Sequence, residues 1–309
     1  MKVYRGLEQY QKVKNAVVTT GTFDGVHLGH RTIINQLKKI ADNYNGETVV
    51  LTFHPHPRLV LQKNSNIKLL GTINERIKLL EEIGVDHLII LPFTKEFSRI
   101  SSLEFVKDIL FNKIGTKKLV IGYDHHFGRN REGSFEHLIE FGPLYGFDIE
   151  EIPAINIKDV NISSTKIREA LETGNIKKAK EYLGRNYSLS GIVVTGNQLG
   201  RSIGFPTANI KIEESYKLIP EIGVYAVNIF HEKRNYQGML NIGFRPTIGN
   251  QLEISIEVHI FDFNGNLYGQ VITVEFVNKI RDERHFKDIE QLKKQLEIDF
   301  IECQNILRT

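Results

Sequence analysis

The sequence predicts two domains: an N-terminal α/β domain with a parallel sheet over residues 1–185, and a C-terminal all-β small barrel with a terminal α-helix over residues 186–309. Three observations support this. The chain has 309 residues, whereas one ordinary domain has roughly 100 to 200. Its first half alternates short apolar runs with helical patterns. Its second half, from residue 187, consists of β-branched and aromatic runs between glycine, asparagine and proline turns.

In the first half, four apolar runs predict buried strands at residues 16–20, 48–53, 87–91 and 119–123. The stretches between them carry apolar residues at helical spacing, for example Ile33, Ile34, Leu37 and Ile40. Alternating strands and helices imply a parallel sheet covered by helices, which binds ligands beyond the carboxyl ends of its strands. We therefore expect three loops to converge there, at residues 21–30, 54–58 and 122–133.

The second half follows a helical stretch at residues 165–183, and we place the boundary near residues 184–188. Strands are predicted at residues 192–195, 224–230, 254–263 and 271–276, with Asn264-Gly265 as a tight turn between the last two. The chain closes with an amphipathic helix, whose predicted apolar face consists of Phe286, Ile289, Leu292, Leu296 and Phe300.

Composition limits the partners and the compartment. The net charge of +3, from 40 basic and 37 acidic residues, gives no global field for nucleic acid or an anionic membrane. Cys303 is the only cysteine, which excludes an intramolecular disulfide and a cysteine-based zinc site. No segment is apolar enough for a signal peptide or a membrane span. We expect a cytoplasmic protein with small-molecule partners; its oligomeric state is not indicated.

The first candidate site is Gly-Thr-Phe-Asp-Gly-Val-His-Leu-Gly-His at residues 21–30, between a predicted strand and a predicted helix. Glycines allow close approach of an anion, and the helix N-terminus offers free N–H groups. His27 and His30 can donate hydrogen bonds to phosphate oxygens. Two histidines alone also fit ordinary loop residues or metal ligands. Asp24 in this glycine turn is compatible with simple turn chemistry.

Hydroxyl and basic residues follow at a second helix start, Ile-Ser-Ser-Thr-Lys-Ile-Arg at residues 162–168. Ser163 or Ser164 can serve as a helix N-cap, which is a common role for serine. A cap does not require Arg168, however, so phosphate binding is the alternative.

Four further histidines lie in the converging loops, in Thr-Phe-His-Pro-His-Pro at residues 52–57 and in the stretch 122–133. They could form a metal site, but His54 and His56 alternate with prolines, and nothing in the sequence supplies the partners that orient metal-bound histidines. We favour nucleotide contacts.

In the second half, residues 191–209 read as a strand leading into a loop with Gly196, Gly200 and Gly204, followed by Pro-Thr-Ala-Asn. This is no Walker loop, because the Gly-Lys-Ser/Thr ending is missing. Phosphate binding would rest on backbone N–H groups of the loop. Glycines in a β domain also commonly mark turns.

The N-terminal segments resemble the nucleotidyltransferase superfamily with a His-x-Gly-His signature, and in particular bacterial FAD synthetases, which transfer AMP from ATP to FMN. The resemblance implies a Rossmann-like domain with His27 and His30 as catalytic residues. The family has Phe-Arg where this chain has His125-His126, which leaves Arg129 or Arg131 to compensate. The implied ATP contacts are Gly21, Phe23, Asp24, Gly29, Ser163, Ser164, Thr165 and Arg168, and the implied flavin contacts are Pro55, His56, Pro57, Asp124 and Phe127.

The C-terminal segments resemble riboflavin kinases. This resemblance implies that Thr207 and Asn209 bind Mg²⁺, whose preferred ligands are hard oxygen atoms. Glu257 would be the general base that accepts a proton from the ribityl hydroxyl, although a glutamate in an alternating strand is most often solvent-facing. The implied ATP contacts are Gly196, Gly200, Arg201 and Gly204, and the implied flavin contacts are Arg281 and Glu283.

Together the resemblances predict a bifunctional enzyme: riboflavin and MgATP give FMN, and FMN and MgATP then give FAD and pyrophosphate. Two alternatives remain open. In the first alternative, only one half of the chain is active. In the second, the protein binds flavins without turnover. The second alternative requires lost catalytic groups, yet Glu257, Thr207, Asn209, His27 and His30 are all present.

Overall fold

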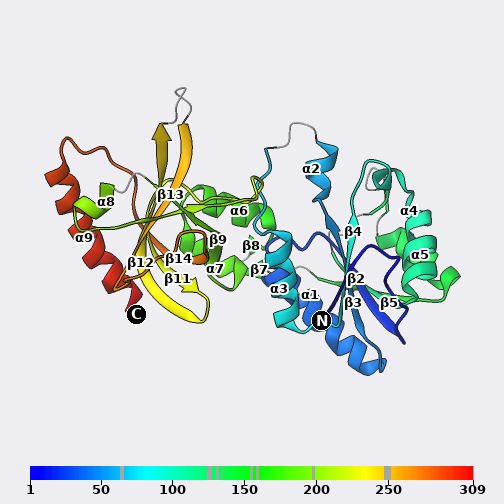
Figure 1. The fold of residues 1–309 in the computed structure, drawn as a ribbon. Coiled ribbons are helices and arrows are strands. Elements are labelled where there is room, and N and C mark those ends of the chain that lie inside the picture. Colours follow the sequence, from blue (N-terminus) through cyan, green and yellow to red (C-terminus); the bar gives the residue numbers. More distant parts are fainter. Residues whose placement is uncertain are drawn as a thin grey trace. The chain divides into compact units, whose positions relative to one another are not determined.

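The computed structural model describes residues 1–62, 66–123, 127–129, 132–133, 135–153, 156–157, 160–196, 199–246 and 252–308. By its internal contacts the chain forms two compact units, Met1–Ser164 and Thr165–Thr309 (Figure 1). Helices α6 (Ser164–Glu172) and α7 (Ile176–Leu183) thus fall almost entirely in the second unit. The assignment of separate functional domains to residues 1–185 and 186–309 stays a prediction.

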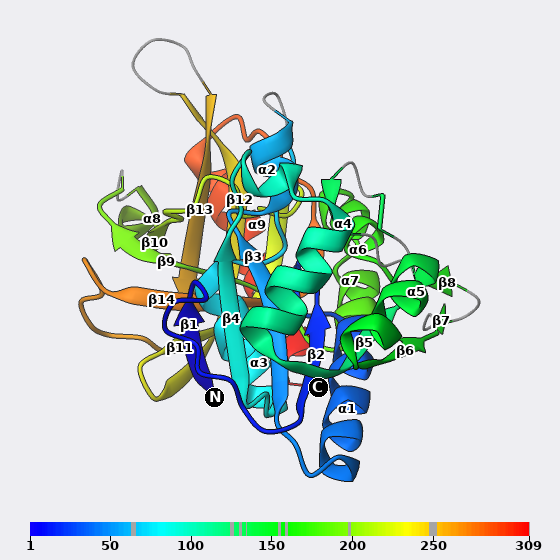
Figure 2. The same ribbon diagram turned by 90° about the vertical axis from the view of Figure 1, so that its right-hand side faces the viewer.

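The first unit contains a six-stranded sheet in the order β1-β4-β3-β2-β5-β6 (Figure 2). All neighbouring strands run parallel, which confirms the predicted sheet. The two edge strands were not among the predicted strands. The strands are β1 (Lys2–Arg5), β2 (Ala16–Thr20), β3 (Thr48–His54), β4 (His87–Pro92), β5 (Thr116–Gly122) and β6 (Asp148–Ile152).

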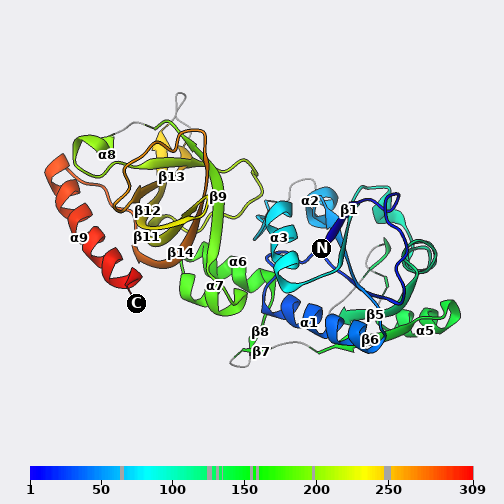
Figure 3. The same cartoon turned by 60° about the horizontal axis from the view of Figure 1, so that its bottom comes forward.

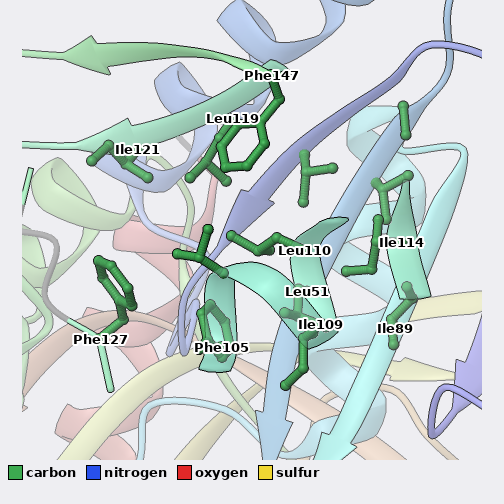
Figure 4. Packing of buried hydrophobic residues seen from close by; sticks show 14 of the residues in the cluster. Leu51, Ile89, Phe105, Ile109, Leu110, Ile114, Leu119, Ile121, Phe127 and Phe147 are labelled. Carbon is green, nitrogen blue, oxygen red and sulfur yellow. The ribbon is translucent and has the colours of Figure 1, made fainter. Parts of the chain in front are cut away.

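Helices cover both faces of this sheet, because its central strands are apolar on both sides. On one face, α1 (Leu28–Asn43) and α3 (Ile73–Ile83) bury Ile34, Leu37 and Leu80. On the other, the π-helix η2 (Phe105–Ile114) packs its apolar residues against β3, β4 and β5 (Figure 4). The unit also contains α2 (Pro57–Leu61), η1 (Phe97–Arg99), α4 (Ser102–Glu104), α5 (Phe135–Tyr145), β7 (Asn156–Ile157) and β8 (Val160–Asn161).

The second unit is a closed barrel in the order β10-β13-β12-β11-β14-β9, as predicted (Figure 3). Strand β9 alternates buried and partly buried residues along its length, which is the pattern of a strand with one face toward a core. Leu189 and Val274 are opposite each other in register and both buried. The strands are β9 (Tyr187–Val194), β10 (Ala208–Lys211), β11 (Gly223–His231), β12 (Arg234–Pro246), β13 (Leu252–Ile260) and β14 (Val271–Arg281), with the short helix α8 (Leu199–Ser202) after β9.

The tight turn predicted at Asn264-Gly265 is wrong. Strand β13 pairs with β10 and β12, whereas β14 pairs with β11 and β9, so the two strands do not form a hairpin. The connection spans residues 261–270, with Asp262 and Gly269 in the left-handed backbone region. Closure of the barrel, which local turn chemistry does not reveal, decides the pairing.

The terminal helix α9 (Ile289–Leu307) packs against β11, β12 and β14. The predicted helix is confirmed, but its predicted face is partly wrong. Phe286 precedes the helix, which begins after the Asp288 cap, and Ile289 is 54% exposed. Leu296 and Phe300 are confirmed as packing residues, and the buried Cys303 joins them.

Among the helices that the structure describes, none has the length and apolar character that crossing a bilayer requires.

Leu110→Ala tests the core under the sheet. Leu110 is fully buried in the apolar cluster between η2 and strands β3, β4 and β5. The truncation should therefore lower the free energy of unfolding by about 2–5 kcal/mol through lost burial and a new cavity. Denaturant unfolding followed by circular dichroism measures this loss. The control Leu144→Ala, at a side chain 74% exposed, should change stability by less than about 0.5 kcal/mol. Equal effects of the two variants would contradict the described packing.

Candidate active sites

The first candidate site lies at the carboxyl end of β2. In the sheet, β2 has β3 on one side and β5 on the other, so the chain order reverses at this strand. Parallel α/β sheets bind ligands in the crevice that such a reversal opens. The residues that follow β2 form the β2 loop (residues 21–27), and α1 begins directly after it.

The β2 loop has an unusual backbone. Phe23 (φ 48°), Gly25 (φ 78°) and Val26 (φ 40°) all lie in the left-handed region. Glycine accepts this conformation readily, but for a β-branched valine it is a genuine outlier. Both apolar side chains are buried, Phe23 at 2% and Val26 at 0% exposure, so packing maintains the strained conformation. Strain of this kind concentrates at functional sites.

Asp24 holds the β2 loop in place. Its buried carboxylate accepts hydrogen bonds from the main-chain N–H groups of Leu70 at 3.0 Å and Gly71 at 3.2 Å. Ser164 Oγ donates to the main-chain oxygen of Asp24 at 3.0 Å. Asp24 and Ser164, two predicted ATP contacts, therefore connect three separate segments around the loop.

The two signature histidines form a stacked pair at the start of α1. Their ring centroids are 3.7 Å apart with an interplanar angle of 20°. His27 occupies the N-cap position of the helix, and the Phe23 ring contacts His30 edge-on at 5.2 Å. Burial, the neighbouring His27 and the charge of Arg76 lower the pKa of His30 well below 6.5. A stacked imidazole pair, in which the lowered pKa keeps His30 neutral, thus lies at a helix N-terminus, an arrangement suited to phosphate.

Arg76 is a residue that the sequence reasoning missed. It lies on α3 with 3% exposure, and its Nη1 donates to Thr52 Oγ1 at 3.1 Å and to the Phe53 carbonyl at 3.2 Å. The pKa of His54 is also lowered, mainly by burial, next by the charge of Arg76 and least by the charge of Arg5. The available signal was a charged residue four positions before Leu80, on the apolar face of a helical pattern.

The predicted flavin-side residues of the first unit have different environments. His56 caps α2, since its Nδ1 accepts a hydrogen bond from the Arg58 N–H at 3.1 Å, and Pro57 opens that helix. Pro55 is exposed. Phe127 is buried against Phe105, with ring centroids 5.7 Å apart. Asp124, His125, His126 and Arg131 lie outside the described residues.

The remaining predicted ATP contacts of this site lie at element ends. Gly21 directly follows β2, and Gly29 lies in the first turn of α1. Ser163 precedes α6, Thr165 is exposed in its first turn, and Arg168 is buried at 9% exposure. Thr165 and Arg168 belong to the second compact unit.

The second candidate site lies on the barrel strands β10, β13 and β12. Asn209 is opposite Glu257, and Glu257 is opposite Asn241 in the strand register. Side chains directly opposite each other share a face of the sheet, so these three form a polar row. Thr207 Oγ1 donates to Glu257 Oε2 at 3.1 Å. Three predicted residues thus come together, and Asn241 is a fourth member that the sequence reasoning missed.

The glycine loop approaches this row closely. A Cβ built on Gly196 would lie 2.1 Å from the amide nitrogen of Asn209, so no larger residue fits there without movement. Gly200 lies in α8, and Gly204 follows it with φ +90°. The side chain of Arg201 lies outside the described residues.

His259 holds the residue that precedes Thr207, and the sequence analysis did not identify it. Its Nδ1 is 2.8 Å from the Pro206 carbonyl, and its ring contacts Phe205 at a centroid distance of 5.3 Å. Phe205 also contacts Phe300 of α9. The signal in the sequence was that His259 lies two residues after Glu257 in an alternating strand, so both side chains point to the same face.

Arg281 and Glu283 border the same face. The Arg281 guanidinium forms a two-pronged ion pair with the buried Asp299 carboxylate of α9, with Nη2 2.6 Å from Oδ2. A Cβ on Gly243 would lie 2.1 Å from Glu283 Oε1 and 3.0 Å from Asn241 Nδ2, so both side chains lie over that glycine. Arg281 anchors the terminal helix, and Glu283 extends the polar row.

The donor set of the second site fits a hard divalent cation together with phosphate. Thr207 supplies a hydroxyl, Asn209 an amide oxygen and Glu257 a carboxylate, the ligand types that Mg²⁺ accepts. Within the described parts of the chain, no three histidine, cysteine, aspartate or glutamate side chains are grouped to hold a metal.

Comparison with known proteins identifies relatives of both units. The FAD synthetase family profile matches residues 9–166, and the riboflavin kinase profile matches residues 183–307. Bifunctional riboflavin kinase/FMN adenylyltransferase is the name of similar proteins from Haemophilus influenzae, 39% identical over 97% of each chain, and Escherichia coli K12, 36% identical over 97% of this chain and 96% of that one. The Buchnera aphidicola protein of the same name, from the pea-aphid subspecies, is 37% identical over 98% of this chain and 97% of its own.

A solved structure shares the fold. The crystal structure of a Streptococcus pneumoniae protein named as a macrolide-efflux protein is 30% identical, with a TM-score of 0.88 over 96% of each chain.

The pKa of His30 predicts a stability change with pH. Above about pH 6.5, the ordinary histidine value, His30 is neutral in both the folded and the unfolded chain. Below it, the unfolded imidazole binds a proton that the folded one does not, so stability should fall as the pH decreases. Thermal unfolding across this range should show a shallower loss for His30→Asn than for the wild type. Parallel curves for the two proteins would contradict the pKa direction.

Proposed function

This chain belongs to the family of bifunctional riboflavin kinases and FMN adenylyltransferases, and on that premise we propose which residues carry each of its two reactions. It phosphorylates riboflavin with ATP to give FMN, and it transfers AMP from ATP to FMN to give FAD and pyrophosphate. We assign adenylyl transfer to the N-terminal domain, residues 1–185, and riboflavin phosphorylation to the C-terminal domain, residues 186–309.

In adenylyl transfer, an oxygen of the FMN phosphate forms a bond to the α-phosphorus of ATP, while the bond to the departing pyrophosphate breaks. The nucleophile is already ionised, so the task of the protein is alignment and charge stabilisation. We propose that His27 and His30, with the N-terminus of α1, bind the ATP phosphates. The observation that carries this proposal is the stacked histidine pair at a helix start behind a strained loop.

The supporting residues of this site divide by their contacts. Phe23 and Asp24 shape the β2 loop from within, and Gly29 brings a backbone N–H group of the first turn of α1 to the phosphates. The Gly21 N–H already donates to the Leu51 carbonyl at 3.0 Å, so Gly21 contributes by having no side chain rather than as a donor. For the other predicted contacts the family resemblance provides the support. They are Ser163, Ser164, Thr165 and Arg168 toward ATP, and Pro55, His56, Pro57, Asp124 and Phe127 toward the flavin.

In riboflavin phosphorylation, the ribityl hydroxyl loses a proton as its oxygen forms a bond to the γ-phosphorus of ATP, while the bond from that phosphorus to the departing ADP breaks. We propose Glu257 as the general base that accepts the proton. The hydrogen bond from Thr207 and the register position opposite Asn209 support this role, since they fix the carboxylate beside the ligands proposed for Mg²⁺. Mg²⁺ held by these residues would neutralise negative charge on the ATP phosphates.

The remaining residues of the kinase site hold the two substrates. Gly196, Gly200, Arg201 and Gly204 form the proposed ATP loop. Asn241 and Glu283 continue the polar row from Glu257 and are placed to receive hydroxyl groups of riboflavin. Arg281 supports the flavin segment through its ion pair with Asp299, which fixes α9. We also propose a cytoplasmic location, because both reactions consume ATP and the single cysteine is buried and free.

Separable loss of the two activities tests this assignment. Glu257→Gln keeps the shape but removes the base, and should lower FMN formation on the order of a hundredfold while FMN adenylation continues. His30→Asn should lower adenylation by on the order of a hundredfold while FMN formation continues. Chromatographic separation of riboflavin, FMN and FAD over time measures both steps. Equal loss of both activities in a folded variant would refute the two-site assignment.

Thr207→Val tests the proposed cation ligand. The substitution keeps the branched shape but removes the hydroxyl oxygen, so FMN formation should require about tenfold more Mg²⁺ or lose activity by that factor. The initial rate of FMN formation, titrated with Mg²⁺, measures the change. Thr173→Val, at an exposed threonine in the turn after α6 of the same unit, is the matched control and should keep the wild-type titration. If Thr207→Val shows the same Mg²⁺ dependence of FMN formation as the wild type, Thr207 is not a ligand of the cation.

A further inference from the structure

Arg76 is the charged side chain whose position is least explained by the fold. It lies on the buried face of α3, in line with Leu80 one turn later, and is 3% exposed. Arginine is almost never fully buried unless specific interactions hold it, and placing its charge in the interior is costly. An apolar residue would fill this helix position with less cost. Its presence therefore indicates a use for the charge.

The contacts of Arg76 lie at the carboxyl end of β3. Nη1 donates to the hydroxyl of Thr52, a fully buried residue, and to the main-chain oxygen of Phe53. The next residue along the strand is His54, from which the predicted flavin-side segment continues. Because the guanidinium holds two consecutive residues, it fixes the direction in which β3 leaves the sheet.

The charge of Arg76 also reaches the histidines of the adenylyltransferase site. His30 is influenced by burial, by His27 and by Arg76, and all three lower its pKa. His54 is influenced by burial, by Arg76 and by Arg5 in the same direction. Arg76 is the charged side chain common to both. The contacts agree, because the Thr52 hydroxyl, which accepts from Arg76, also donates to the main-chain oxygen of Thr22 in the β2 loop at 3.3 Å.

We propose that Arg76 is a positioning residue for adenylyl transfer: its buried guanidinium fixes the end of β3 and supplies a permanent positive charge next to the β2 loop that leads to the phosphate-binding histidines. This inference rests on the proposed role of His27 and His30. A fixed charge in a buried position acts strongly on developing phosphate charge, because little solvent screens it and no reorganisation is needed during reaction. It also favours the neutral form of His30 without occupying the site itself.

Three variants of the full chain separate charge from structure. Arg76→Met keeps a long side chain but removes the charge, and Arg76→Lys keeps the charge with fewer donors. Lys78→Met removes the same charge from an exposed position on the same helix and is the matched control. Each variant is assayed for FMN formation and for FMN adenylation, and its histidine pKa values are measured by NMR titration.

Arg76→Met should lower kcat/KM for adenylation by about tenfold to a hundredfold, the cost expected of misplaced reacting groups, and leave FMN formation unchanged. The pKa values of His30 and His54 should both rise, because loss of a nearby cation favours the protonated imidazole. Arg76→Lys should retain the low histidine pKa values and recover part of the adenylation activity. Lys78→Met should match the wild type in all measurements.

Wild-type adenylation by Arg76→Met, or a loss of adenylation with no change in either histidine pKa, would overturn the inference. If Arg76→Met does not fold, Arg76→Lys decides, because it keeps the charge while removing donors that hold the end of β3. A several-fold loss of adenylation at unchanged histidine pKa values supports the inference, and full activity refutes it. If His30→Asn also keeps full adenylation, the proposed site itself is wrong; if only Arg76→Met does, only this inference fails.

Discussion

The buried carboxylate of Asp24 is the constraint on which the first site depends. Taking an ionised carboxylate out of water is costly unless hydrogen bonds replace the lost hydration, and here two main-chain N–H groups, of Leu70 and Gly71, do so. These bonds hold the β2 loop in a conformation that Phe23 and Val26 would not adopt alone. The strained loop in turn places His27 at the helix start, where the stacked pair and the free N–H groups meet.

The second site depends on a different kind of constraint, the strand register of a closed barrel. Register alone brings Asn209, Glu257 and Asn241 into one row, because opposite residues of paired strands share a face. The buried ion pair between Arg281 and Asp299 then fixes α9 against β14, next to the segment that carries Glu283. A slip of one residue would turn the row to the other face, so closure of the barrel protects the site.

The different chemistry of the two reactions explains the different composition of the two sites. A phosphate nucleophile needs no base, and the first site presents stacked imidazoles, a helix N-terminus and the buried Arg76. A hydroxyl nucleophile must lose a proton, and the second site presents a carboxylate held by the Thr207 hydroxyl. On the proposed assignment, each unit thus contains the groups that its own reaction requires.

The sequence by itself determined the element types, the parallel sheet, the barrel and the signature residues, because hydrophobic periodicity and glycine-rich loops are local properties. Only the tertiary structure decided the partners. Barrel closure separated β13 from β14 despite Asn264-Gly265, and packing on the barrel moved the buried face of α9 toward Cys303. Arg76, Asn241 and His259 gain their positions from contacts between residues far apart in the chain. Such contacts leave no local pattern, since burial and register are fixed only when distant segments pack together.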